Sequence, residues 1–381
     1  MVTVAENRKR VFRKWIIPFA LLCVGIVFFS YYNLKKEKSA LLTQSVSLCP
    51  SLQSIPYAED LGIIKRVVRV SLPQVKAPHN PGLIAYEDGF FLVFRYDVKE
   101  KGKIPFGSLM MPFRTCIGSA KLNADFQLVS PVLRIDTGSD FSEDPRLFQI
   151  EDQVYITYND AEDNSINSRT IHMAKLDPNT LQIRDHVNLA QYYQKIEKNW
   201  VPFLCQENGE SKLHFEYCFN PHVIFRMEDP LKNELTHLVQ PNHVAVQRMP
   251  WKSSWGPVRG GTPPILVDGQ YLSFFHSFFR ERKKVWYVMG AYTFESTPPF
   301  RITACSSSPI LFREIYNTKA LNTACSDKRV IFPSGIVLAQ EDDREVLYVA
   351  CGENDCAIKV VTFDKEALVK SLQPIDLYQK R

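Results

Sequence analysis

The chain has 381 residues, of which 45% are apolar and 23% are charged, a composition typical of a folded globular protein. This composition excludes a disordered tail protein, a collagen-like repeat and a transporter with many membrane spans. The net charge is +5, but five basic side chains against Glu6 place +4 of it in the first fourteen residues. A nucleic-acid-binding protein concentrates Lys and Arg on its folded domain, so we expect no nucleic-acid partner.

An uncharged apolar segment follows the basic N-terminus. It runs for 18 residues, from Trp15 to Tyr32, and is just long enough to span a bilayer core of about 30 Å. More basic residues precede the segment than follow it, which predicts a cytoplasmic N-terminus and a domain on the other side of the membrane. A cleaved signal peptide is the alternative, but its apolar region is usually about 7–15 residues and ends in a small-residue cleavage site.

These features predict a single-pass type II membrane protein with its catalytic domain in the lumen of the secretory pathway. We divide the chain into a cytoplasmic tail (1–14), a transmembrane helix (15–32), a stem and lead-in (33–77) and a catalytic domain (78–381). A short, Phe-rich span suits the thinner membranes of the Golgi apparatus and early secretory pathway better than the plasma membrane.

Eight cysteines follow the predicted span, an even number that an oxidising lumen allows to pair as disulfides. Buried free thiols are the alternative that the sequence leaves open. The eight are Cys49, Cys116, Cys205, Cys218, Cys305, Cys325, Cys351 and Cys356. No two have the Cys-x2-Cys spacing of a zinc site, and no Asp-x-Asp motif of metal-dependent transferases stands at a predicted strand end. We therefore expect neither a metal nor another cofactor.

A loose pattern repeats five times beyond the stem: a proline, an apolar run, a polar turn and a second run rich in aromatic residues. The repeats open at Pro81, Pro145, Pro202, Pro264 and Pro333, at intervals of 64, 57, 62 and 69 residues. Each interval is long enough for four strands and their loops. The pattern predicts an all-β fold, a five-bladed β-propeller. The alternative is a β-sandwich in which the prolines recur by coincidence.

Four of the polar turns contain dipeptides typical of tight β-hairpins. They are Asp88-Gly89, Glu151-Asp152, Asn208-Gly209 and Asp268-Gly269. Such dipeptides between apolar runs are the strongest short-range signal for a hairpin. We therefore expect a hairpin in the middle of each of these repeats.

Side chains suited to catalysis stand beside the repeat openings. The innermost strands of a propeller line one central channel, so residues beside the openings converge from all the blades. A carboxylic acid there can protonate a glycosidic oxygen, cations can hold phosphate, and aromatic rings can stack on sugar faces. The candidate site residues are Arg95, Glu143, Asp144, Arg146, Lys198, Asn199, Arg259, His276, Tyr348 and Asp355.

Each of these residues has a structural alternative when it is taken alone. Arg146 can clamp Glu143 without touching a substrate, and Lys198 can be a solvated surface side chain. His276 lies in an apolar strand, where a histidine is more often part of the core than a ligand. Their shared position beside the openings favours a functional site.

Four short motifs at these positions resemble the β-mannoside phosphorylase family and its glycosyltransferase relatives. They are Ser142-Glu143-Asp144-Pro145-Arg146, Lys198-Asn199-Trp200-Val201-Pro202-Phe203, Arg259-Gly260-Gly261-Thr262-Pro263 and Gly352-Glu353-Asn354-Asp355. The resemblance covers roughly residues 78–365. It implies a five-bladed propeller that makes or breaks β-mannosidic bonds.

The resemblance also implies roles for single residues. Asp144 matches the family's catalytic acid, which donates a proton to the glycosidic oxygen through a substrate hydroxyl. Inversion follows from direct attack by phosphate or by an acceptor hydroxyl. The residues that fall where phosphate or a sugar phosphate is held are Arg146, Lys198 and His276, and those at the sugar rim are Asp355 and Tyr348.

Topology decides our leading hypothesis. The resembled enzymes are mostly soluble, whereas a membrane-tethered enzyme of the secretory pathway more often builds glycans than degrades them. We therefore expect a type II membrane glycosyltransferase that adds β-linked mannose to a glycan acceptor from a sugar phosphate or nucleotide sugar, with Asp144 as acid or base. The alternatives are a β-mannoside phosphorylase or glycoside hydrolase and, third, a carbohydrate-binding propeller without enzymatic activity.

Overall fold

The computed structural model describes residues 46–106, 109–162, 165–189, 194–227, 247–319 and 327–375. These residues belong to one compact unit, Val46–Arg381. The predicted cytoplasmic tail and membrane span lie outside the described residues. Within the described part, no helix combines the length and the apolar character that crossing a membrane requires.

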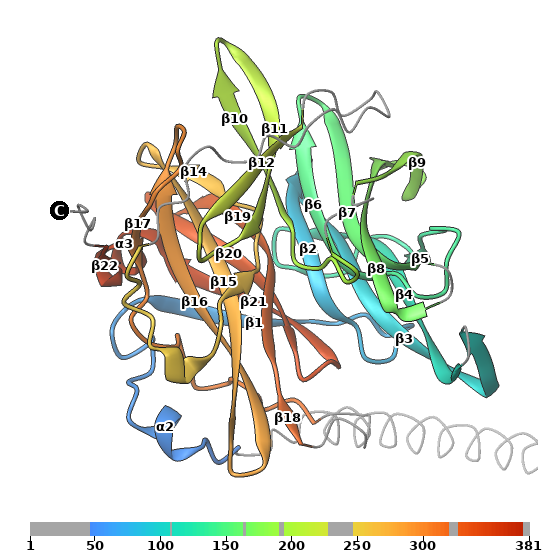
Figure 1. Cartoon of the computed structure of the whole chain (residues 1–381), viewed down its shortest axis with the longest axis horizontal. Coiled ribbons are helices and arrows are strands. Elements are labelled where there is room, and N and C mark those ends of the chain that lie inside the picture. The colour runs from blue at the N-terminus through green and yellow to red at the C-terminus, as the bar shows by residue number, and fades with distance from the viewer. Residues whose placement is uncertain are drawn as a thin grey trace, which may run out of the picture. The chain divides into compact units, whose positions relative to one another are not determined.

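Five sheets make up most of the described chain, and the first three are built from consecutive strands (Figure 1). The first sheet contains β2 (His79–Tyr86), β3 (Gly89–Phe106), β4 (Leu109–Asn123) and β5 (Leu133–Arg134). The second contains β6 (Glu143–Ile150), β7 (Gln153–Glu162), β8 (Ser165–Asp177) and β9 (Gln182–Asn188). The third contains β10 (Val201–Glu207), β11 (Glu210–Cys218) and β12 (Val223–Met227).

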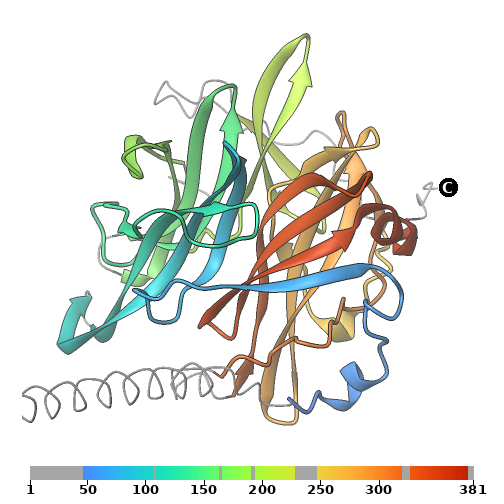
Figure 2. The same ribbon diagram turned by 180° about the vertical axis from the view of Figure 1, so that it is seen from behind.

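The fourth and fifth sheets also take strands from distant parts of the chain. The fourth contains β13 (Arg259–Gly260), β14 (Ile265–Val267), β15 (Gln270–Glu281), β16 (Lys284–Glu295), β17 (Ile302–Cys305), β18 (Lys328–Arg329) and β22 (Gln373–Pro374). The fifth contains β19 (Ile331–Glu341), β20 (Arg344–Glu353), β21 (Ala357–Asp364) and β1 (Ile64–Val70). The strand β1 pairs antiparallel with β21, so the first strand of the domain completes the last sheet (Figure 2).

The helices in the described part of the chain are short. They are α2 (Pro50–Gln53), the 3-10 helix η1 (Ser253–Trp255) and α3 (Lys365–Ser371). In α3 the side chain of Asp364 caps the N-terminus by accepting a hydrogen bond from the Ala367 amide over 2.9 Å. This cap satisfies one of the amide groups that have no partner within the helix.

Each opening proline lies in, or directly before, one strand of a different sheet. Pro81, Pro145, Pro202 and Pro333 lie within β2, β6, β10 and β19, and Pro264 directly precedes β14. These five strands meet: β2, β6 and β19 contact one another, β10 contacts β6, and β14 contacts β19. The residues beside the openings are therefore brought together, as the repeat pattern predicts.

The four hairpin predictions are confirmed. Each dipeptide lies at the turn between two consecutive strands of one sheet. These strand pairs are β2–β3, β6–β7, β10–β11 and β14–β15. Glu151, Asn208 and Asp268 have positive φ angles of 50°, 53° and 49° in these turns. Tight hairpins need such angles, and Asn, Asp and Gly adopt them most readily.

Hydrophobic cores lie between successive sheets, because neighbouring residues of a strand face opposite sides of the sheet. In β3, Phe91 packs with Ile156 between the first two sheets, whereas Leu92 packs with Tyr348 between the first and fifth. Other cores fill the space between the second and third sheets, and among the third, fourth and fifth. This closed series of cores belongs to an all-β, propeller-like fold and excludes the single core of a two-layer β-sandwich.

Free thiols predominate among the cysteines of the described residues. Six are free thiols, and all of these except Cys218 are buried: Cys49, Cys116, Cys205, Cys218, Cys305 and Cys351. Buried free thiols, the alternative to disulfides, therefore describe most of these positions. Cys325 lies outside the described residues.

Candidate active site

The candidate site begins where β6 departs from regular strand geometry. Asp144 has a positive φ of 55°, and the pairing of β6 with β7 shifts between Glu143 and Arg146. A positive φ outside glycine costs roughly 1–3 kcal/mol, so the surrounding structure must hold this conformation. Irregularities of this kind re-aim side chains beside active sites. Here Asp144 is left largely buried, with 7% of its surface exposed.

Arg146 holds this backbone in place. Its guanidinium donates from Nε to the Gly261 carbonyl (2.7 Å), from Nη2 to the Gly260 carbonyl (3.1 Å) and from Nη1 to the Asp144 carbonyl (3.3 Å). Only 3% of the residue is exposed. Arg146 is therefore a clamp, but on backbone carbonyls rather than on Glu143. A contact of Arg146 with phosphate stays a prediction.

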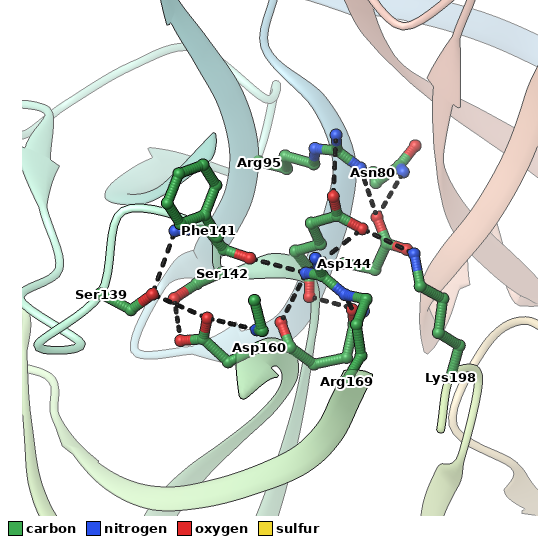
Figure 3. A network of polar contacts seen from close by, with 12 residues as sticks. Asn80, Arg95, Ser139, Phe141, Ser142, Asp144, Asp160, Arg169 and Lys198 are labelled. Carbon is green, nitrogen blue, oxygen red and sulfur yellow. Dashed lines mark hydrogen bonds and ion pairs between the residues drawn. The ribbon is translucent and has the colours of Figure 1, made fainter. Parts of the chain in front are cut away.

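Two residues of the first sheet reach the Asp144 carboxylate. Asn80 Nδ2 donates to Asp144 Oδ1 over 2.7 Å, and Arg95 Nη1 lies 3.4 Å from the same oxygen (Figure 3). Asn80 also has a positive φ, of 47°, and it precedes Pro81 as Asp144 precedes Pro145. Asn80 was not among the candidates predicted from the sequence, although its place before an opening proline is a signal that points to it.

Glu143 gathers three cations beside Asp144. Its carboxylate lies 2.9 Å from Lys198 Nζ, 3.3 Å from Arg95 Nη2 and 3.4 Å from Arg169 Nη2. The exposed fractions of these side chains are 34% for Lys198, 18% for Arg95 and 6% for Arg169. Lys198 and Arg95 are therefore the cations that an incoming anion can reach.

The electrostatic balance keeps both carboxylates ionised. Burial alone raises the pKa of Asp144, but the charges of Arg95 and Lys198 and the Asn80 hydrogen bond hold it well below the usual range. Burial likewise raises the pKa of Glu143, and the surrounding cations lower it further than burial raises it. At neutral pH the two negative charges thus stand among cations from the first and second sheets and from the loop before β10.

Hydrogen bonds hold the loop that places Lys198 beside Glu143. The Glu197 amide donates to the Arg169 carbonyl over 2.9 Å, and the Glu197 carboxylate accepts a hydrogen bond from Trp200 Nε1 over 3.0 Å. Asn199 has a positive φ of 64°. A Cβ at Gly260 would collide with the Asn199 carbonyl oxygen, so the glycine allows this loop to pack closely on β13. Asn199 thus serves the site through its backbone conformation.

The fifth sheet contributes the turn between β20 and β21. Asp355 stands in this turn with a positive φ of 52°. Burial lowers the pKa of Arg95, but the neighbouring carboxylates, Asp355 among them, raise it by more. A Cβ at Gly352 would collide with Asn80, so this glycine lets the first and fifth sheets meet at the site.

The fourth sheet pairs His276 of β15 with Arg259 of β13. His276 is 2% exposed, and its ring centroid lies 4.3 Å from that of Phe332. Burial, together with the charge of Arg146, lowers the pKa of His276 to about 3. His276 is therefore neutral at physiological pH and offers a hydrogen bond rather than a positive charge. Arg259 is exposed, and its guanidinium lies 4.7 Å from the centre of the Phe278 ring.

Tyr348 lies apart from this group. Its ring packs against Phe90 and Phe126 in the core between the first and fifth sheets, and its hydroxyl donates to Glu341 over 2.7 Å. The alternation of side chains along β20 turns Tyr348 toward that core. This position corrects the expectation that Tyr348 contacts the sugar.

Arg169 is a second residue that the sequence analysis missed. Besides Glu143, it binds Asn159 Oδ1 through Nε (2.6 Å) and the Phe141 carbonyl through Nη2 (2.6 Å). It lies inside β8, far along the chain from any opening proline. Only the pairing of β8 with β7 brings it to the site, and no motif in the sequence marks it.

A scan of protein families matches residues 53–373 to the family described as beta-1,4-mannooligosaccharide phosphorylase, glycoside hydrolase family 130. The chain belongs to this family. Its members are enzymes, phosphorylases and hydrolases that act on β-mannosides. No curated protein matches the chain by sequence. The family match favours the alternative of a phosphorylase or hydrolase over the leading hypothesis of a membrane glycosyltransferase.

Several solved structures share the fold. A β-1,2-mannobiose phosphorylase from Listeria innocua, in complex with β-1,2-mannobiose, is 16% identical with a TM-score of 0.56, over 83% of this chain and 98% of that chain. A mannose phosphorylase from Leishmania mexicana, in complex with phosphate, is 12% identical with a TM-score of 0.54, over 85% of this chain and 96% of that chain. At these identities the likeness concerns the fold alone.

The arrangement in this family 130 chain suits anion and hydroxyl recognition. Arg95 and Lys198 supply accessible positive charge, Asn80 supplies an amide, and Asp144 supplies a carboxylate that can exchange a proton. Family 130 phosphorylases bind a glycan and phosphate, and the Arg95 guanidinium has the planar fork that suits phosphate. Across the described ranges, no group of three or more His, Cys, Asp or Glu side chains is arranged to hold a metal ion.

Proposed function

We propose that the chain is a β-mannoside phosphorylase that transfers a mannosyl unit between phosphate and a glycan hydroxyl, with inversion at the anomeric carbon. The observation that carries this proposal is one buried carboxylate, Asp144, beside two partly exposed cations, Arg95 and Lys198. Inverting phosphorolysis needs one proton donor and a cationic place for the attacking phosphate. The proposal also takes each of the five sheets as one blade of a five-bladed propeller.

The environment of Glu143 favours phosphate over water as the attacking group. Inverting hydrolysis needs a second carboxylate that acts as general base toward water. Glu143 is the neighbouring carboxylate, and although burial raises its pKa, the cations around it lower the pKa below its usual range. A carboxylate held in this way is a weak base, whereas the same cations attract phosphate.

The proposed reaction runs in either direction. In degradation, a phosphate oxygen attacks the anomeric carbon and the glycosidic C–O bond breaks. The departing oxygen takes up a proton that Asp144 supplies through a substrate hydroxyl, and the products are mannose 1-phosphate and a shortened glycan. In synthesis, the acceptor hydroxyl attacks the anomeric carbon of mannose 1-phosphate, phosphate leaves, and Asp144 receives the proton.

The charges around Asp144 assign it a different role in each direction. In the free site its pKa is low and it is ionised, so it is ready to accept a proton from an acceptor hydroxyl. A bound phosphate dianion offsets the positive charges of Arg95 and Lys198 and so raises the pKa of Asp144. Phosphate binding therefore prepares Asp144 to act as the acid in degradation.

Glycosyl transfer at a membrane is a second candidate function, favoured by the apolar segment from Trp15 to Tyr32. In this proposal the chain is a single-pass type II protein of the Golgi apparatus or another secretory membrane, with a lumenal catalytic domain. It would add a β-linked mannose to a glycan acceptor from a nucleotide sugar, with Asp144 as the base.

The choice of donor separates the candidates. The full chain in mild detergent, as wild type and as Asp144→Asn, is incubated with phosphate and β-mannosides, or with mannosyl acceptors and either mannose 1-phosphate or GDP-mannose. Products are identified by mass spectrometry. We expect phosphate-dependent release of mannose 1-phosphate, and hexose addition from mannose 1-phosphate, both lost in the variant.

The other outcomes each identify an alternative. Hexose addition from GDP-mannose alone would replace the proposal with the membrane glycosyltransferase. Release of free mannose without any dependence on phosphate would indicate a hydrolase. Sugar binding that persists in Asp144→Asn, without turnover by either protein, would indicate a carbohydrate-binding propeller.

A further inference from the structure

We propose that Asp160, a buried carboxylate outside the substrate site, is a positioning residue that holds the segment carrying Asp144 in its productive conformation. This inference rests on the proposed function, because it concerns the same acid. Asp160 lies near the end of β7 and is 4% exposed. Its carboxylate contacts the loop before Asp144 rather than Asp144 itself (Figure 3).

Both carboxylate oxygens of Asp160 accept hydrogen bonds from this loop. Ser139 Oγ donates to Oδ1 and Ser142 Oγ donates to Oδ2, each over 2.7 Å. Because the single hydroxyl proton of Ser142 goes to Asp160, Thr137 is the donor in the 2.7 Å contact between the Thr137 and Ser142 hydroxyls. The Asp160 carboxylate thus holds Ser139 and Ser142 directly, and through Ser142 it sets the direction of the hydrogen bond from Thr137.

A carboxylate suits this position better than an amide does. The Ala161 amide also donates to Asp160 Oδ1, over 2.7 Å, so three donors converge on the two oxygens. A carboxylate accepts on both oxygens, whereas an amide accepts on one and donates from the other. Burial raises the pKa of Asp160 above its usual range, and the hydrogen bonds from Ser139, Ser142 and Ala161 offset only part of that rise.

Asp144 is held from both sides along the chain. Ser142, two residues before it, is bound to Asp160, and Arg146, two residues after it, is bound to carbonyls of the fourth sheet. A non-glycine residue at positive φ persists only when the surrounding structure fixes it. Release of Ser142 frees one side, so Asp144 relaxes toward regular strand geometry and its carboxylate withdraws from Asn80.

Three variants of the full chain in mild detergent test this role. Asp160→Ala removes both acceptors, Ser142→Ala removes one of the two loop bonds, and Asp160→Asn keeps the shape and one acceptor. The matched control is Asp177→Ala, because the Asp177 carboxylate also caps a turn, accepting amides at the far end of β8. For each protein, kcat, the KM for phosphate, the pH dependence of kcat/KM and the thermal unfolding temperature are measured.

We expect a split between kcat and KM. Asp160→Ala lowers kcat by about 10–100-fold, the cost of a misplaced catalytic group, and leaves the KM for phosphate unchanged because Arg95 and Lys198 come from other elements. Ser142→Ala has a smaller effect in the same direction, and Asp160→Asn, which keeps one acceptor, recovers part of the lost kcat. The acid limb of kcat/KM for synthesis, which reports Asp144 in the free enzyme, moves to higher pH in Asp160→Ala.

A folded Asp160→Ala with wild-type kcat would overturn the inference. A rise in the KM for phosphate equal to the fall in kcat would do the same, as would an equal kinetic loss in Asp177→Ala at the same unfolding temperature. If the wild type shows no turnover, the proposed function fails instead. The carboxyl pKa of Asp144, titrated by NMR in wild type and Asp160→Ala, then decides the positioning role: a raised pKa in the variant supports it and an unchanged one refutes it.

Discussion

Two groups of charged residues in this domain contain similar residue types but differ in how far solvent and ligands can reach them. In the fifth sheet, Glu353 and Lys359 form an ion pair of 3.0 Å, and their side chains are 0% and 2% exposed. Lys359 Nζ also donates to Asn317 Oδ1 over 2.8 Å, and the Glu353 carboxylate accepts a hydrogen bond from the Thr318 amide over 3.1 Å. This pair fastens the chain before β18 to the sheet, and its donors and acceptors are occupied.

The group around Asp144 is open by comparison. Arg95 and Lys198 keep 18% and 34% of their side chains exposed, and Asn80 Oδ1 is buried with no hydrogen-bond partner in the described part of the chain. An open group can exchange an internal ion pair for a substrate anion, whereas a closed one cannot. A binding site therefore differs from a structural ion pair in its exposure and its unused hydrogen-bonding groups, rather than in charge alone.

The largest effect on function is expected from Asp144→Asn. The amide cannot exchange the proton, so kcat/KM falls about 10³-fold or more in both directions, within the range of general acid–base catalysis. Folding changes little, because Arg95 keeps its ion pair with Glu143. Steady-state kinetics and thermal unfolding measure the two effects. Retention of more than a tenth of the activity would contradict the role of Asp144.

The largest effect on stability is expected from the closed pair. Lys359→Met leaves the Glu353 carboxylate buried without its cation, so the free energy of unfolding falls by about 3–5 kcal/mol. Adding Glu353→Gln restores most of the loss, because the uncompensated charge is removed. Denaturant unfolding measures both variants. If Lys359→Met instead lowers kcat of the folded enzyme without destabilising it, the contrast between the two groups fails.

A more selective effect is expected from Lys198→Met. Loss of a hydrogen bond to a charged group costs about 1.5–3 kcal/mol, so the KM for phosphate rises roughly 10–100-fold while kcat changes less. The free energy of unfolding stays within about 1 kcal/mol, because the pair with Glu143 is partly exposed. Kinetics with varied phosphate test this. An unchanged KM would show that phosphate binds elsewhere.

The smallest effect concerns pH. Asp144 has a lowered pKa, so the ionised form that synthesis needs persists as pH falls and is lost only below the ordinary Asp value of about 3.9. We expect kcat/KM for synthesis to show no acid limb between pH 7 and about 5, whereas degradation, which needs the acid, slows as pH rises. An acid limb near pH 6 for synthesis would mean that the cations do not act on Asp144 as the geometry implies.

The repeat and its hairpins were predictable because they depend on local chemistry. A proline at each opening and a turn dipeptide between apolar runs report backbone constraints that act over a few residues. The same periodicity located Asp144 and Lys198, since both stand near an opening. The repeat pattern also identified Arg95 as a candidate, because this residue ends the second apolar run of the first repeat.

The misses concern contacts that only the assembled fold decides. The sequence did not predict that Arg146 donates to the carbonyls of Gly260 and Gly261, because these contacts depend on where the fourth sheet meets β6. Tyr348 was expected to contact the sugar. The pairing of β20 with its neighbouring strands decides which of its side chains face the core, and it turns Tyr348 toward the core. Arg169 acts across a strand pair and carries no motif.

The closure of the last sheet by the first strand has a consequence for biosynthesis. Residues 64–70 are made early, yet their partners are residues 358–363. The hydrogen-bonding edge of the first strand therefore stays uncovered while nearly three hundred further residues are synthesised. This takes on the order of 15–60 s at 5–20 residues per second. An uncovered edge invites pairing with another chain, so this domain depends on protection of its first strand during translation more than a protein whose sheets close locally.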